Sequence, residues 1–124
     1  MKNRPFRERL GFALAGLRAG FRREASFRTQ MAIAGVALVA LLILRPDPLW
    51  WAVVAVTVAL VLALELINSA LEAVIDLLHP GLHPEIKAAK DMLAGAVLTI
   101  SIAALVVGIA LMVTQAAEWM EWMR

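Results

Sequence analysis

Three long apolar stretches constrain the fold of this chain more than any other feature of its sequence. They cover residues 31–44, 49–64 and 92–113, and a helix needs about 20 mostly apolar residues to cross a bilayer. The first stretch is short for that length, so its span has to include residues 27–30, with the Arg28 side chain extended toward the headgroups. Of the 124 residues, 62% are hydrophobic, against roughly 45–50% in soluble domains. We therefore predict an all-α membrane protein with a single domain, residues 1–124. The expected membrane spans are residues 26–44, 49–78 and 86–114.

The positive charges predict the orientation of these spans. Eight of the 12 Lys and Arg residues lie in the first 28 positions, and Lys87 and Lys90 lie between the second and third apolar stretches. Because short cytoplasmic segments are enriched in Lys and Arg, we expect the N-terminus and the 77–91 connection in the cytoplasm and the C-terminus outside. All four Trp residues then fall at the outer interface, where aromatic side chains are enriched.

Residues 5–24 are predicted to form an amphipathic helix on the membrane surface. Apolar side chains recur at helical spacing on one face of this segment, and basic side chains lie off that face. The apolar set is Phe6, Leu10, Ala13, Leu14, Leu17 and Phe21. Prolines at 46, 48, 80 and 84 predict the turns between the spans, because a residue before proline is pushed out of the helical conformation.

The second expected span carries a polar stripe that a simple membrane anchor does not need. Offsets of 0, 3, 4, 7 and 11 positions place five polar side chains within an arc of roughly 100°. They are Glu65, Asn68, Ser69, Glu72 and Asp76. Carboxylates are costly near the bilayer core, so three of them on one face indicate a functional site. Hydrogen bonds between helices would account for Asn68 and Ser69, but not cheaply for the carboxylates.

Further charges are expected at the membrane level of this stripe. Glu24 precedes the first span, and Lys90 and Asp91 precede the third. Carboxylates with an asparagine suit Mg²⁺, which is commonly held by one or two carboxylates together with phosphate oxygens. The chain has no Cys, and His79 and His83 are expected to be solvated loop residues, so no zinc site is indicated. Neither a Walker A sequence nor a protein-kinase glycine loop is present, and phosphoryl transfer is at this point one option among several.

Three segments resemble the signature of the small prokaryotic diacylglycerol kinase family. They are E-L-I-N-S-A-L-E-A-V-I-D at 65–76, A-K-D-M-L-A-G-A-V-L at 89–98, and G-L-R-A-G-F-R-R-E-A-S-F-R at 16–28. The resemblance implies a surface helix and three transmembrane helices in each subunit, and a homotrimer in the bacterial inner membrane with sites at subunit boundaries. It also implies transfer of the ATP γ-phosphate to a lipid hydroxyl, usually that of diacylglycerol, giving phosphatidic acid. Close relatives phosphorylate undecaprenol instead.

The matched positions imply roles for individual residues. Glu65 is expected to be the general base, and Glu24 and Glu72 the Mg²⁺ ligands. The expected ATP contacts are Asn68, Asp76, Lys90 and Asp91. Asn68 would also support the metal ligands. The expected lipid contacts are Arg28, Gln30 and Ser69. Well-known members of the family carry a second glutamate where this chain has Gln30, and some carry an aromatic residue where it has Leu14; both differences bear on the choice of lipid more than on phosphoryl transfer.

The expected activity is therefore that of an ATP- and Mg²⁺-dependent diacylglycerol kinase, with no nucleic-acid partner. An undecaprenol kinase on the same scaffold is the nearest alternative. A small proton or cation conductor would use the carboxylate row as a relay, but it does not account for Lys90 and Asp91 or for the basic surface helix. A non-catalytic membrane subunit is a further alternative, in which Glu72 would be dispensable.

Overall fold

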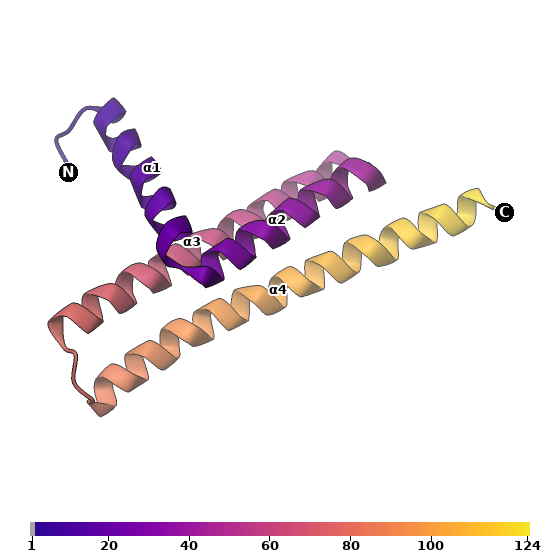
Figure 1. The fold of residues 1–124 in the computed structure, drawn as a ribbon. Helices are drawn as coiled ribbons and strands as arrows, with labels where there is room; N and C mark the ends of the chain where they lie inside the picture. The colour runs from indigo at the N-terminus through magenta and orange to yellow at the C-terminus, as the bar shows by residue number, and fades with distance from the viewer. Residues whose placement is uncertain (1) are drawn as a thin grey trace.

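The computed structural model describes residues 2–124, and within them it contains four helices and no strands (Figure 1). The helices are α1 (Phe6–Arg23), α2 (Ala25–Leu44), α3 (Pro48–Leu78) and α4 (Pro84–Trp122). The predicted all-α fold is confirmed. Three of the helices, α2, α3 and α4, are long and apolar enough to cross a membrane, and the chain is a membrane protein.

The three long helices run side by side, and α3 is the central one. It packs against α4 along much of its length, against α2, and against the end of α1. α1 leaves the bundle at a steep angle from the point where α2 begins (Figure 1). Its apolar side chains, among them Phe6 and Phe21, stay exposed in the single chain. The junction of α1 with α2, residues 20–28, is called the elbow below.

The turns between the helices follow from proline and from local caps. Arg45 caps the C-terminal end of α2: its φ of 47° is left-handed, and its N–H donates to Leu41 O at 2.9 Å. Pro48 and Pro84 stand in the first turns of α3 and α4, where their missing N–H costs nothing. His83, expected as a solvated loop residue, is exposed and also caps α4, because its Nδ1 accepts the Glu85 N–H at 3.1 Å.

Side-chain packing joins the helices at two levels. Near the turn between α2 and α3, the buried cluster of Leu41, Val54 and Leu111 brings together all three long helices. At the elbow, Phe27 is 2% exposed and is the most buried large side chain among the described residues. A side chain at Gly20 would displace Leu66 of α3, so this glycine permits the close approach of α1 to α3.

The helix lengths show how far each helix extends beyond a bilayer core. At about 1.5 Å per residue, the 20 residues of α2 span about 30 Å, the thickness of the hydrocarbon core. By the same rise, α3 with 31 residues and α4 with 39 reach about 46 and 58 Å. α3 continues past the start of α2 on the side where α1 leaves (Figure 1). α4 continues to Trp122, past Thr114, at which we expected its membrane span to end.

Candidate functional site

Glu65 lies at the elbow and is buried there. It is 4% exposed and is the one buried charged side chain among residues 2–124. The Ser26 hydroxyl, in the first turn of α2, donates a hydrogen bond to Glu65 Oε2 at 3.1 Å. This bond places the Glu65 carboxylate beside the first turn of α2. Although the sequence places Glu65 well inside a long apolar span, the structure sets it level with the start of α2.

The remainder of the polar stripe continues along α3 beyond the elbow. Asn68, Ser69 and Glu72 are half-buried, and Asp76 is exposed. Asn68 Oδ1 is buried and has no hydrogen-bond partner within the described part of the chain. Such an atom calls for a partner from outside the chain. The stripe therefore presents oxygen ligands whose bonding capacity the chain itself leaves unused.

The predicted nucleotide contacts on α4 are held in ion pairs. Lys90 Nζ lies 2.6 Å from Asp76 Oδ1 and ties α4 to α3. Lys87 Nζ lies 2.7 Å from Asp91 Oδ2 within α4, and Lys87 was not among the predicted site residues. The side chains of both pairs are well exposed, and exposed ion pairs contribute little to stability. Their consequence is positional: Asp76 holds the Lys90 ammonium beside the polar stripe.

Glu24 lies between α1 and α2, and its backbone completes both helices. Its N–H donates to Gly20 O at 3.0 Å, and its carbonyl accepts the Arg28 N–H at 3.2 Å. The side chain is half-buried and forms no hydrogen bond or ion pair with residues 2–124. Glu24 is part of the elbow and stands two positions before Ser26, whose hydroxyl contacts Glu65. The described residues contain no cluster of three His, Asp or Glu side chains that would complete a metal site within one chain.

Arg28 binds the end of α1. Its Nη1 donates to the carbonyls of Phe21 at 2.8 Å and Arg22 at 3.1 Å. The last carbonyls of a helix lack partners within the helix, and a cation there also complements the helix dipole. Arg28 therefore closes the elbow, whereas the sequence suggested a side chain extended toward the headgroups. Gln30 and Ser69, the other expected lipid contacts, are half-buried and form no side-chain hydrogen bond among the described residues.

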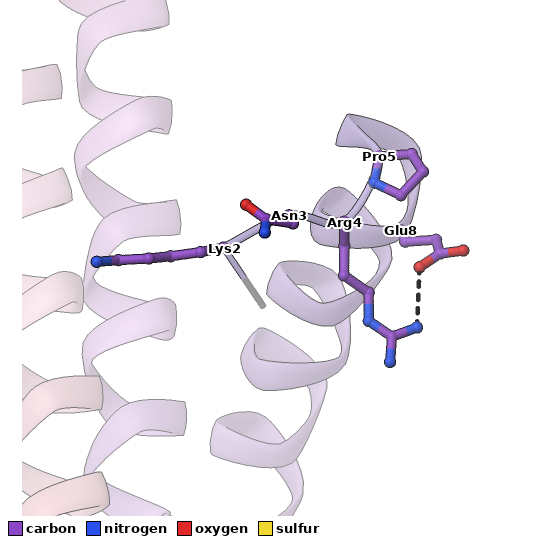
Figure 2. Close-up of a pocket in the computed structure, with 5 residues that line it drawn as sticks. All are labelled: Lys2, Asn3, Arg4, Pro5 and Glu8. Atoms are coloured by element: carbon purple, nitrogen blue, oxygen red, sulfur yellow. Dashed lines mark hydrogen bonds and ion pairs between the residues drawn. The ribbon is translucent and has the colours of Figure 1, made fainter.

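A shallow hollow at the other end of α1 is not part of this site. It is lined by residues 2–5 and by Glu8, and Figure 2 shows Lys2 directed away from the Arg4–Glu8 pair. Arg4 Nη1 lies 3.2 Å from Glu8 Oε2, and both side chains are exposed. No group from α2, α3 or α4 contributes to the hollow, so it brings no set of reactive side chains together.

The fold and the elbow define an all-helical membrane protein with a charged site at one end of its central span. Residues 11–112 match the model of the family described as prokaryotic diacylglycerol kinase. The chain belongs to this family of membrane lipid kinases. The resemblance seen in the sequence is thereby confirmed.

Several named relatives are similar over most of this chain. A diacylglycerol kinase of Synechocystis is 40% identical over 98 residues, which are 78% of this chain and 56% of the relative. The diacylglycerol kinase of Escherichia coli K12 is 35% identical over a segment that covers 77% of this chain and 79% of the relative. The undecaprenol kinase of Bacillus subtilis is 31% identical over 71% of this chain and 72% of its own. The match thus spans little more than half the length of the Synechocystis relative, and most of the other two.

Proposed function

We propose that this protein is a lipid kinase that transfers the γ-phosphate of ATP to the hydroxyl of diacylglycerol, giving phosphatidic acid. The observation that carries the proposal is the buried Glu65 carboxylate at the elbow, on the same stripe of α3 as the Lys90–Asp76 pair. A carboxylate and an ammonium held along one polar stripe suit the two ends of a phosphoryl transfer. Membership of the family supports the same activity.

In this proposal the two ends of the stripe serve different reactants. Glu65 takes the proton from the lipid hydroxyl as its oxygen bonds to the γ-phosphorus. The bond from that phosphorus to the β–γ bridging oxygen breaks, and ADP leaves with the electron pair. Lys90 neutralises charge on the phosphates, and Asp76 and Asp91 orient the nucleotide. Positioning and charge neutralisation are the main catalytic effects in phosphoryl transfer.

Glu24 of the elbow, together with Asn68 and Glu72 of the polar stripe, would fit a bound Mg²⁺. Glu24 and Glu72 offer carboxylate oxygens, and the buried Oδ1 of Asn68 lacks a partner among the described residues. Hard cations such as Mg²⁺ use one or two protein carboxylates and take further oxygens from phosphates and water, so a cluster of three acidic side chains is not required. When bound, the ion would neutralise charge on the transferred phosphoryl group. Glu24 and Glu72 would hold it, and Asn68 would support them.

We propose further that the protein works as a homotrimer. Few of the apolar residues in α2, α3 and α4 are buried by the chain itself. A side chain at Gly35, Gly95 or Gly108 would point into open space in the single chain, and small residues allow transmembrane helices of neighbouring subunits to pack closely. Mixing Glu24→Gln with Glu72→Gln subunits tests whether sites are shared: recovered activity is expected, and its absence would contradict composite sites.

The proposed location is the bacterial inner membrane, with the N-terminus and the 77–91 connection in the cytoplasm. The concentration of Lys and Arg in the first 28 positions supports this orientation. ATP then arrives from the cytoplasm at the α3–α4 end of the stripe. Cysteine labelling from either side of sealed cells, at positions 3 and 123 in turn, tests the orientation; labelling of position 3 from outside would contradict it.

The decisive experiment offers both lipids to the purified protein. Diacylglycerol and undecaprenol are supplied at equal mole fraction in the same micelles with γ-labelled ATP and Mg²⁺, and a chelator control is run beside them. We expect labelled phosphatidic acid as the main product. Preferential labelling of the polyprenol would support the second candidate, which the similarity to the Bacillus subtilis undecaprenol kinase favours.

Two results would reject lipid phosphorylation altogether. No label in either lipid would do so, and ion flux across sealed vesicles without ATP would favour a conductor. Full retention of phosphorylation in Glu72→Gln would leave a kinase but remove the proposed Mg²⁺ ligand.

A further inference from the structure

Ser26 is the partner that the chain supplies to Glu65. Within residues 2–124, its hydroxyl is the one group that donates a hydrogen bond to this carboxylate, and it does so to Oε2 at 3.1 Å. The second oxygen, Oε1, accepts no hydrogen bond from the described residues. The contact joins the first turn of α2 to α3, across 39 positions of sequence. One oxygen of the carboxylate is thus held and the other is available.

We propose that Ser26 is a positioning residue for Glu65. Its hydroxyl holds Oε2, so that Oε1 faces the reactant and accepts the proton of the lipid hydroxyl. This inference rests on the proposed function, in which Glu65 is the general base. Ser26 contacts neither substrate, and its contribution acts through Glu65.

The physical need for such a donor follows from the flexibility of glutamate. The terminal torsion of the side chain is broad, and a free carboxylate loses much rotamer freedom when it is ordered. A general base has to lie within about 2.6–3.2 Å of the oxygen whose proton it removes. A hydrogen bond to one oxygen reduces the orientations of the carboxylate before the substrate arrives.

The donor is itself held in place by its neighbours in the sequence. Phe27 is buried between the helices of the elbow, and Arg28 is bound to the carbonyls of Phe21 and Arg22. The two residues that follow Ser26 therefore fix the first turn of α2 against α1. Ser26 transmits this rigidity to the carboxylate on α3.

The test compares Ser26→Ala and Ser26→Thr with a matched control in the same turn. Thr29→Val removes a hydroxyl that bonds only to its own helix, at Ala25 O. A hydrogen bond to a charged group corresponds to about 10- to 100-fold in rate. We expect kcat to fall by about that factor in Ser26→Ala, while KM for ATP and for the lipid changes by less than about twofold. Ser26→Thr keeps the hydroxyl and is expected to retain activity, as is Thr29→Val.

The dependence on Glu65 provides a second measurement. In a Glu65→Gln background, adding Ser26→Ala is expected to lower the residual rate by less than about twofold, because residues that act as a unit are not additive. If Ser26→Ala does not fold, Ser26→Cys replaces it, since a thiol of similar shape is a weak donor; its kcat is expected below that of Ser26→Thr.

Three outcomes would overturn the inference. They are a wild-type kcat in Ser26→Ala or Ser26→Cys, an equal loss in Thr29→Val, and a further large loss in the double variant. Each leaves the proposed function intact if Glu65→Gln retains only a small residual rate. Full activity of Glu65→Gln would instead remove Glu65 as the base, and absence of lipid phosphorylation by the wild-type protein would reject the proposed function itself.

Discussion

Replacing Arg28 by alanine should loosen the surface helix from the membrane bundle. The substitution removes the two hydrogen bonds from Nη1 to the carbonyls of Phe21 and Arg22. A hydrogen bond to a charged group contributes about 1.5–3 kcal/mol where it is shielded from water. Because Arg28 is exposed, we discount the two bonds together to about 1–2 kcal/mol. The fraction of molecules with α1 undocked should then rise about 5- to 30-fold.

Trypsin measures this fraction directly, because Arg22 and Arg23 stand at the elbow. Cleavage of a transiently opened segment follows its equilibrium population when closing is faster than cutting. Arg28→Ala is expected to be cut at this junction about 5- to 30-fold faster than the wild type, and Arg28→Lys at an intermediate rate. Arg18→Ala is the control, since Arg18 forms no side-chain hydrogen bond among the described residues. Equal rates in Arg28→Ala and the wild type would refute the role given to this side chain.

Three further substitutions test other parts of the structure. Glu72→Gln is expected to abolish lipid phosphorylation while the thermal unfolding midpoint stays within about 2 °C, because the half-buried Glu72 side chain forms no hydrogen bond or ion pair among the described residues; retained activity would contradict the proposed metal ligand. Arg45→Gly should raise the free energy of unfolding by about 0.5–1 kcal/mol, because the left-handed φ of 47° is less favourable for a residue with a side chain than for glycine. An unchanged denaturation midpoint would refute this. Leu111→Ala should lower the free energy of unfolding by about 2–3 kcal/mol, because Leu111 is 5% exposed in the three-helix cluster. Leu105 is 63% exposed and serves as the control; an equal effect of Leu105→Ala would contradict the packing.

The positions of the helices were predictable because local rules decide them. The apolar stretch at 92–113 is long enough to have few alternatives to a spanning helix, and the stretches at 31–44 and 49–64 reach that length with their flanking residues. Prolines at 46, 48, 80 and 84 mark the turns between them. The polar stripe was visible for the same reason, since 3.6-residue periodicity fixes which side chains share a face. The grouping of Glu65, Asn68 and Glu72 on one face therefore needed no knowledge of the fold.

Contacts between helices were not predictable, because periodicity does not say which faces meet. The Ser26–Glu65 bond, the Lys90–Asp76 pair and the binding of Arg28 to the end of α1 all join segments on different helices. Ser26 did stand inside the segment that resembles the family, two positions after Glu24, but a hydroxyl there has no distinguishing pattern. The pairing of Lys87 with Asp91 differs, because both residues lie in α4 four positions apart, and helical spacing alone could have indicated it.

The level of Glu65 explains how a buried carboxylate can persist in so apolar a chain. A charge at the bilayer centre costs about 2.5–3.5 kcal/mol or more, and the cost falls toward the interface. α2 is about as long as the hydrocarbon core is thick, so we expect its first turn at the boundary of that core. The Ser26–Glu65 bond then sets Glu65 at the same level. A lipid hydroxyl also lies at this boundary, where the glycerol or terminal alcohol meets the headgroups. In the proposed reaction the carboxylate of Glu65 therefore does not have to move into the hydrocarbon core, and the lipid hydroxyl does not have to move into water. The part of α3 beyond the elbow carries Glu72 and Asp76 outward to where a water-soluble nucleotide can reach them.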